Sequence, residues 1–314
     1  MPTAHLNFVA IVFTAIDVIL EPYFLFLVLR KSTPGMKIYQ IFLILISLSN
    51  FVFSILFFVD SPTTFLSKSY LFIISSTLPS VVSWFVYQVS MSFLAIQLQL
   101  SLLMLMYACH EITHPTNALN LRSKWLWIFI PVFVFGPAFG YVGCNYVAKV
   151  NYEFYNFSLS GPGLPLIIYL FLYSSSYSIQ AAFSVIRIRR VISKSSVQIS
   201  PATVKLANTV LRNFLVTVAN VCLFVSFPVF VAVVADILSL PTVSSLMFAI
   251  VSRTIPFYVT GYTVASIFIF APYRHFTVEL AKRVFLCRKG TTAKVGPASV
   301  TTSVASRSTE TRHK

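Results

Sequence analysis

The stretch from residue 39 to residue 59 reads YQIFLILISLSNFVFSILFFV, and it contains no charged residue, no proline and no glycine. A helix of about 20 residues is long enough to cross the hydrocarbon core of a bilayer. The stretch shows no sustained alternation of polar and apolar residues, which a strand of a membrane β-barrel would show. It therefore predicts one membrane-spanning helix.

Six other stretches are similarly long and apolar, and each is bounded by charged or turn-forming residues. The seven predicted spans lie at 8–29, 39–59, 77–106, 125–143, 162–186, 213–236 and 245–270. The composition agrees, because 57% of the 314 residues are hydrophobic and only 10% are charged, whereas a soluble domain has about 25% charged residues. This excludes a soluble enzyme, a disordered chain and a collagen-like fibre. We expect an all-α integral membrane protein, a seven-transmembrane helix bundle.

The net charge of +15 is unevenly distributed along the chain. With seven spans, 20 of the 23 Lys and Arg residues fall on one side of the membrane; the other side holds only Lys68 and Lys149, and Arg253 lies within the seventh span. The basic side consists of loops 30–38, 107–124 and 187–212 and the segment from residue 271 onward. Lys and Arg gather in cytoplasmic loops, so we expect the N-terminus outside and the C-terminus inside. The charge then needs no nucleic acid as a partner.

Beyond the seventh span, the sequence changes character twice. Residues 273–287 read YRHFTVELAKRVFLC, and Phe276, Leu280 and Val284 share one face of a helix. This pattern predicts a short amphipathic helix on the inner leaflet, which contacts membrane lipid. Residues 291–314 are rich in Ser, Thr and Ala without an apolar period, which predicts a disordered tail. We therefore divide the chain into a seven-span body, residues 1–290, and this cytoplasmic tail.

Two positions are candidates for covalent modification. Asn156 begins an Asn-Phe-Ser triplet in a loop expected outside, so it is a candidate glycosylation site. Cys287 ends the predicted amphipathic helix, so it is a candidate for lipidation by a palmitoyl group. A chance triplet and a free cytoplasmic thiol are the alternatives.

Three short motifs stand at the ends of the predicted spans. Pro22-Tyr23 lie near the end of the first span, residues 33–39 read TPGMKIY at the start of the second, and residues 271–274 read APYR after the seventh. In this order and at these helix ends, the motifs resemble those of nematode serpentine chemoreceptors of the Str superfamily, in particular its Srh and Sri branches. The resemblance covers the whole seven-span layout.

The resemblance implies the fold and the function of a G-protein-coupled receptor. Such a receptor lies in the plasma membrane of sensory neurons and their cilia, and it serves olfaction by binding an odorant or pheromone from outside. It activates a heterotrimeric G protein when the inner end of the sixth helix moves outward. Tyr273 and Arg274 would then face the G protein. The resemblance implies no cofactor.

Two helix faces are candidates for the ligand site. Their residues are Trp84, Tyr87, Gln88 and Met91 in the third span and Tyr169, Tyr173 and Tyr177 in the fifth. The spacing within each set places the side chains on one side of a helix. Aromatic rings with a few hydrogen-bonding groups suit a small, partly apolar molecule. Packing between helices and an aromatic belt at the membrane surface are the alternatives.

Asp17, Glu21 and Arg253 are ionisable residues within the spans, where a charge is costly and indicates a function or a pairing. Asp17 and Arg253 lie at similar depths below the outer ends of the first and seventh spans, which are neighbours in a seven-helix receptor bundle. We therefore expect an ion pair between them, with Glu21, one turn from Asp17, as the alternative partner. The pair either joins two helices or contacts the ligand.

The sixth span and the loop before it bear on signal transmission. Pro228 removes a backbone hydrogen bond within the span, so it is a candidate hinge, with a static kink as the alternative. Arg187, Arg189 and Arg190 lie in the preceding loop and are expected to face the G protein. Chain orientation and contact with anionic lipid are other roles for the same charges.

The chain shows no catalytic constellation and no metal site. It has no Gly-rich phosphate loop, no Gly-x-Ser-x-Gly sequence and no convergent set of metal ligands. His110 and His114 share a helix face, but only Glu111 lies near them in the sequence. An enzyme is therefore not expected, and a small membrane transporter or a ligand-gated channel is the main alternative to a receptor.

Overall fold

The computed structural model describes residues 2–60, 63–67, 70–74, 78–114, 124–151, 154–156, 164–194 and 200–285. A short 3-10 turn, Pro34–Met36, precedes the second helix, and a π-helical turn, Cys222–Ser226, joins the sixth helix to the seventh. The helices are α1 (Pro2–Lys31), α2 (Lys37–Asp60), α3 (Ser80–Thr113), α4 (Lys124–Ala148), α5 (Leu164–Lys194), α6 (Pro201–Val221), α7 (Phe227–Ile237), α8 (Pro241–Ile269) and α9 (Ala271–Phe285).

Seven helical stretches within the described residues are long and apolar enough to cross a membrane, which confirms the number and order of the predicted spans. The protein is therefore a multi-pass membrane protein. The sixth span differs most from its predicted bounds, because it begins twelve residues before position 213. The observed spans are Ile11–Lys31, Pro34–Asp60, Val81–Thr113, Ile128–Val147, Leu164–Ser193, Pro201–Ala235 and Thr242–Ile269.

Local sequence explains the early start of α6. The hydroxyl of Ser200 accepts a hydrogen bond from the backbone N–H of Thr203 at 3.2 Å, which caps the helix. Pro201 fills the first helical position, where its fixed φ angle fits and its missing N–H costs nothing. Polar residues between 201 and 212 lower the mean hydropathy of this segment, so the length of the apolar stretch does not predict this first part of the helix.

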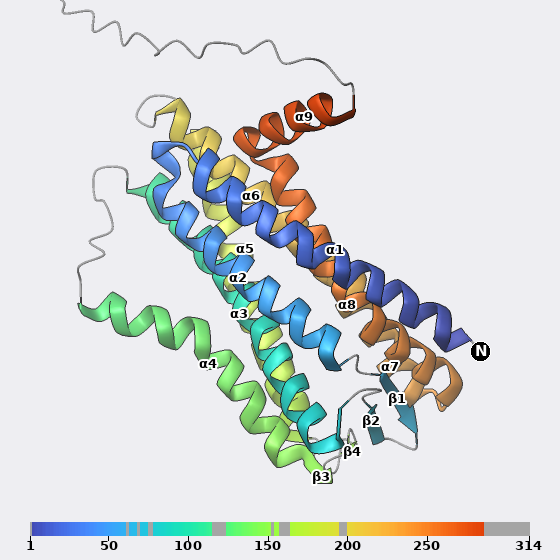
Figure 1. Ribbon diagram of the computed structural model, residues 1–314. Coiled ribbons are helices and arrows are strands. Elements are labelled where there is room, and N and C mark those ends of the chain that lie inside the picture. The colour runs from blue at the N-terminus through green and yellow to red at the C-terminus, as the bar shows by residue number, and fades with distance from the viewer. Residues whose placement is uncertain are drawn as a thin grey trace, which may run out of the picture. The chain divides into compact units, whose positions relative to one another are not determined.

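The helices are arranged around α3, which contacts α2, α4, α5 and α6, whereas α8 contacts α1, α6 and α7 (Figure 1). By contrast, α5 and α6 share few contacts. The largest apolar core lies at the end of the bundle where α1 and α3 end and α2 and α6 begin. We call this the basic end, because the helix termini there carry Arg30, Lys31, Lys37, Arg189, Arg190 and Lys205.

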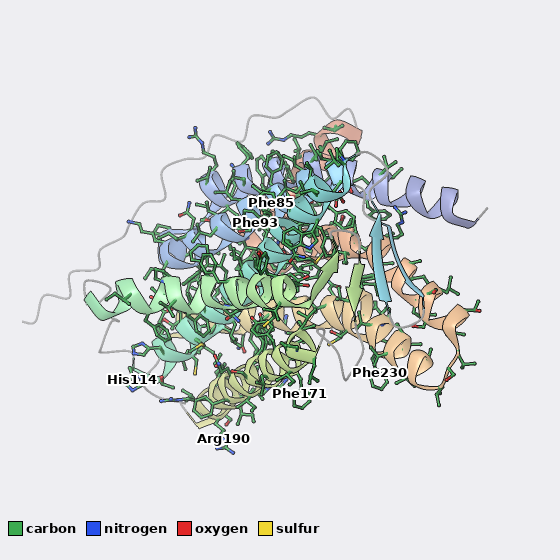
Figure 2. The ribbon with its side chains drawn as sticks, turned by 90° about the horizontal axis from the view of Figure 1, so that it is seen from below. Phe85, Phe93, His114, Phe171, Arg190 and Phe230 are labelled. Atoms are coloured by element: carbon green, nitrogen blue, oxygen red, sulfur yellow. The ribbon has the colours of Figure 1, made fainter. Side chains whose placement is uncertain are left out.

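Large apolar side chains cover the outside of the spans. Ile19 and Phe139 are each 75% exposed, and Phe171 is 70% exposed. Phe171 and Phe230 point away from the bundle in Figure 2. An apolar surface of this extent is incompatible with water and fits the hydrocarbon of a bilayer.

A small sheet adds to the all-α fold that the sequence predicts. β1 (Thr63–Ser67) and β2 (Tyr70–Ile74) follow α2, and β3 (Lys149–Asn151) and β4 (Phe154–Asn156) follow α4. They form an antiparallel sheet in the order β1-β2-β4-β3, at the opposite end of the bundle from the basic end (Figure 1). Strands this short carry too few residues for a periodic signal, so the sequence does not predict them. Asn156 lies in β4, opposite Tyr70 of β2.

The chain forms two compact units, Met1–Phe276 and Thr277–Lys314. The boundary falls within α9, which covers most of the amphipathic helix expected over residues 273–287. Cys287 and the expected tail, residues 291–314, lie outside the described residues.

Candidate functional site

Glu21 is a buried carboxylate that joins three helices. Its side chain is 1% exposed. From α2 it accepts hydrogen bonds from the Ser47 hydroxyl at 2.6 Å and the Asn50 amide at 2.9 Å. From α8 it accepts a hydrogen bond from the hydroxyl of Thr263. These donors replace the water that the carboxylate loses on burial.

Asp17 lies one turn from Glu21 on α1 and repeats this pattern with fewer donors. It is fully buried, and it accepts hydrogen bonds from Thr260 of α8 at 2.5 Å and from Ser54 of α2 at 3.4 Å. Together, the two carboxylates form a polar seam between α1, α2 and α8, and the donors to them from α2 and α8 are neutral hydroxyls and one amide.

This arrangement differs from the expected ion pair with Arg253. Thr260 lies opposite Asp17, and Arg253 lies seven residues earlier on α8, about 10 Å along the helix axis at 1.5 Å per residue. Thr263, which bonds Glu21, lies further still from Arg253. Asp17 and Arg253 would lie at equal depth only if the outer ends of the first and seventh spans were level. The register of α1 against α8 shows that these ends are not level.

Three tyrosines form a column along α5, as the spacing of the fifth span predicts. The ring centroids of Tyr169 and Tyr173 are 6.1 Å apart, and those of Tyr173 and Tyr177 are 6.2 Å apart. Tyr169 donates a hydrogen bond to the Pro137 carbonyl of α4 at 2.5 Å. The hydroxyl of Tyr173 accepts one from Gln99 of α3 at 3.1 Å. The column therefore contacts α3 and α4 within the bundle.

Two hollows flank this tyrosine column. The inner hollow, of about 170 Å³, lies between α3, α4 and α5, and its lining includes Met91, Pro137 and Tyr169. The lateral hollow, of about 440 Å³, lies between α3, α5, α6 and the π-helical turn. Leu98 and Tyr173 line both, so the two hollows meet at these side chains.

The structure brings part of the expected third-span face to this place. Met91 lines the inner hollow, whereas Trp84, Tyr87 and Gln88 lie one to two turns nearer the sheet end of α3. Leu98 and Gln99 also take part in the site, although the sequence does not predict it. A leucine in an apolar span gives no signal of its own, and the role of Gln99 depends on its contact with Tyr173 from another helix.

The sixth span is interrupted where the sequence predicts a hinge. In the π-helical turn, the backbone N–H of Phe227 donates to the carbonyl of Cys222, five residues earlier. Pro228 has no N–H to donate to the carbonyl of Phe224, its normal partner four residues earlier. The hydroxyl of Thr254 in α8 donates to that carbonyl instead, at 3.0 Å. Thr254 thus replaces the missing donor and ties the interruption to α8.

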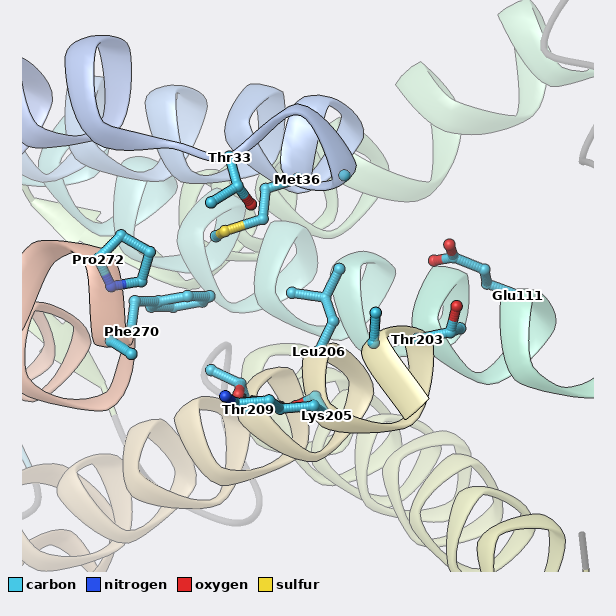
Figure 3. A pocket seen from close by; sticks show the side chains of 12 residues that line it. Thr33, Met36, Glu111, Thr203, Lys205, Leu206, Thr209, Phe270 and Pro272 are labelled. Carbon is cyan, nitrogen blue, oxygen red and sulfur yellow. Dashed lines mark hydrogen bonds between the residues drawn. The ribbon is translucent and has the colours of Figure 1, made fainter. Parts of the chain in front are cut away.

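A third hollow opens at the basic end of the bundle, with a volume of about 390 Å³ (Figure 3). Its walls come from the turn before α2, the end of α3, the start of α6 and the junction of α8 and α9. In Figure 3, Leu206 lies between Glu111 on one side and Phe270 with Pro272 on the other. The full lining is Thr33, Gly35, Met36, Glu111, Ala202, Thr203, Lys205, Leu206, Thr209, Phe270, Ala271 and Pro272.

Two hydrogen bonds stabilise the helix ends around this basic-end hollow. Tyr39 of α2 donates to the carboxylate of Glu111 at 2.6 Å, and Ser32 and Tyr273 share a hydrogen bond of 2.7 Å between their hydroxyls. Burial raises the pKa of the Tyr273 phenol to about 12. The hollow is therefore a formed feature of packed helix ends.

The residues expected to face a G protein have different surroundings. Tyr273 is fully buried among apolar residues of α1 and α8, so its side chain is not available to a partner, contrary to the expectation. Arg187, Arg189 and Arg190 lie on the last turns of α5 and are exposed, and Arg274 at the start of α9 is exposed as well. Figure 2 shows Arg190 projecting from the bundle.

No family model matches this chain, and no curated protein matches its sequence. The function is therefore inferred from the residues and geometry of the site.

Proposed function

We propose that the protein is a G-protein-coupled chemosensory receptor that binds a small external molecule and signals through a hinge in its sixth span. One observation carries this proposal: the sixth span is interrupted at Pro228, and its other end, the start of α6, forms a wall of the hollow at the basic end. A bend at the interruption moves that wall. A change in the middle of the membrane thereby alters the surface at one end of the bundle.

The distribution of charge supports an orientation with the basic end in the cytoplasm. The residues of that side carry 20 of the 23 Lys and Arg residues, and such residues are retained on the cytoplasmic side during insertion. The N-terminus is then outside, and the tyrosine column lies in the half of the bundle nearer the outer surface. The protein would reside in the plasma membrane, as the resemblance to nematode serpentine chemoreceptors implies.

The proposed mechanism couples the two ends of the bundle through α6. In the closed form, Leu206 and Thr203 lie beside Glu111 of α3. Outward movement of the start of α6 widens the basic-end hollow and admits a segment of the G protein. Arg187, Arg189, Arg190 and Arg274 are exposed at this end and attract the acidic groups of a partner.

Expression of the full chain in cells with a promiscuous Gα subunit and a calcium readout tests the proposal. We expect at least one compound of an odorant panel to give a calcium signal that is absent from cells lacking the Gα subunit. Ligand-gated current that persists without any G protein would instead support a channel.

The orientation gives a prediction of its own. An epitope tag at the N-terminus should be stained by antibody on intact cells, whereas the same tag at the C-terminus should be stained only after permeabilisation. Staining of both tags, or of neither, on intact cells would contradict seven spans with this orientation.

The basic residues at the end of α5 give another prediction. Replacing Arg187, Arg189 and Arg190 together by Gln should reduce G-protein activation at least tenfold, because it removes three exposed positive charges beside the proposed docking hollow. Ligand binding and chain orientation should be unchanged, since most basic residues on that side remain. Equal signalling at equal surface expression would limit these arginines to a role in membrane insertion.

A further inference from the structure

The lateral hollow between α5 and α6 lies within the membrane-spanning part of the bundle. All of its lining residues fall in the third, fifth and sixth spans. It arises because α5 presents small side chains toward α6 at helical spacing: Ser174, Ser178, Ala181 and Ala182. With a volume of about 440 Å³, it has the size of sites that hold small molecules.

This hollow opens sideways, toward the outside of the bundle. Its floor includes the buried side chains of Ala181 and Phe214, whereas Ser178, Leu215 and other rim residues are exposed. The few contacts between α5 and α6 leave the gap unclosed. Because hydrocarbon surrounds the spans at this depth, a molecule reaches the hollow from the bilayer.

One hydrogen-bonding group of the hollow has unused capacity. The hydroxyl oxygen of Tyr173 accepts from Gln99, and among the described residues no acceptor is found for its hydroxyl hydrogen. Gln99 is only 4% exposed, and its amide oxygen, Oε1, has no hydrogen-bond partner among the described residues. Buried polar groups are normally satisfied. A ligand oxygen beside Tyr173 would accept the hydrogen that the protein leaves unused.

The depth of Tyr173 identifies the type of occupant. Tyr173 lies nine residues beyond Leu164, about 13 Å along α5. The oxygens of phospholipids lie at the membrane surface and do not reach this depth. An acceptor oxygen here belongs to a molecule that is itself dissolved in the hydrocarbon.

We propose that the lateral hollow is a ligand site reached from the bilayer, and that it takes an aliphatic molecule with one hydrogen-bond-accepting oxygen, such as a ketone. The apolar walls hold the aliphatic part, and Tyr173 donates to the oxygen. Cys222 and Ser226 of the π-helical turn line the hollow, so the ligand presses against the interruption of the sixth span. Binding at this site is independent of signalling, and only its effect on a G protein rests on the proposed function.

Photolabelling of the full chain in phosphatidylcholine nanodiscs tests the site. The probe is an aliphatic ketone that carries a diazirine, and adducts are located by mass spectrometry. We expect saturable labelling of residues that line the hollow on α5 and α6, above the labelling of the exposed Phe139 of α4. Labelling that does not saturate and is equal on all lipid-facing helices would overturn the proposal, as would displacement of the probe by phosphatidylcholine that carries a diazirine in its acyl chain.

Two variants with matched controls sharpen this test. Ser178→Trp fills the hollow from its exposed rim and should remove the saturable labelling, whereas Ile179→Trp, at the neighbouring exposed position outside the lining, should not. Tyr173→Phe should weaken ketone binding roughly fivefold, the effect of one neutral hydrogen bond. The same variant should leave a diazirine alkane unaffected. Unchanged ketone binding in Tyr173→Phe, or in Ser178→Trp, would refute the assignment.

The same nanodiscs separate this inference from the proposed function. Nucleotide exchange on an added heterotrimeric G protein is measured with and without the ketone. Saturable binding that is lost in Ser178→Trp supports the site even if exchange does not change, and in that case the receptor function is what fails. Ligand-dependent exchange that persists in Ser178→Trp supports a receptor but places its ligand elsewhere and overturns the site.

Discussion

Glu21→Ala should almost abolish delivery of the protein to the cell surface and lower its thermal stability more than any other single change considered. The substitution removes the carboxylate that accepts from the hydroxyls of Ser47 and Thr263 and from the amide of Asn50. Only longer contacts remain for Ser47, at 3.5 Å to the backbone carbonyl of residue 21, and for Asn50, at 3.4 Å to the hydroxyl of Thr263. A buried donor without a partner costs about 1–3 kcal/mol. Because three donors lose their main acceptor together, we expect a loss of about 3 kcal/mol, a large part of the stability of a typical protein.

Thermal unfolding of the purified protein in detergent measures this effect, and staining of intact cells measures delivery. Glu21→Gln is the matched variant, because its amide oxygen still accepts hydrogen bonds, and it should lose less stability than Glu21→Ala. Ile19→Ala is the control on the same helix, since Ile19 is 75% exposed and faces away from the seam. If Glu21→Ala unfolded at the temperature of Ile19→Ala, the polar seam would not hold α1, α2 and α8 together.

On the proposed receptor function, Thr254→Val should raise signalling in the absence of ligand about tenfold. Valine has the shape of threonine but no hydroxyl, so the carbonyl of Phe224 loses the donor that stands in for Pro228. The loss costs about 1–2 kcal/mol, and 1.4 kcal/mol corresponds to a factor of ten in an equilibrium. The interruption in the sixth span is then released from α8, and the start of α6 moves away from Glu111 more often.

A double substitution shows whether the effect depends on the proline. Pro228→Ala restores a backbone N–H that can bond the carbonyl of Phe224 within the helix. In that background, Thr254→Val should change basal nucleotide exchange on the G protein by less than twofold, a coupling that a double-mutant cycle measures. Thr254→Ser, which keeps the hydroxyl, is the control. Equal effects of Thr254→Val in the two backgrounds would show that the hydrogen bond from Thr254 to the Phe224 carbonyl does not restrain the sixth span.

The sequence predicts the role of Pro228 but not that of Thr254. Proline breaks the backbone pattern of any helix, so the sequence alone marks position 228 as a point of bending. Thr254 is one of many hydroxyl residues in the spans, and nothing local distinguishes it. Its role appears only when α8 packs against the interruption and brings the hydroxyl to within 3.0 Å of the Phe224 carbonyl.

The carboxylates show the same division. That Asp17 and Glu21 need partners inside the membrane follows from the cost of placing them in hydrocarbon. Which residues become partners depends on the register of α1 against α2 and α8, and a shift of two helical turns exchanges Thr260 for Arg253. The depth of a residue below the end of its apolar stretch does not decide between Thr260 and Arg253, because the ends of neighbouring spans are not level.

The seven membrane-spanning helices can be predicted without any structure, because the hydrocarbon thickness sets a length of about 20 apolar residues that can be counted along the chain. The asymmetry of charge between the two sides and the position of Pro228 follow from the amino-acid order as well. Helix packing, by contrast, sets the partners of Asp17 and Glu21, the burial of Tyr273, the small sheet and the hollow between α5 and α6. These depend on distances between residues far apart in the sequence, and such distances are set by how the helices pack.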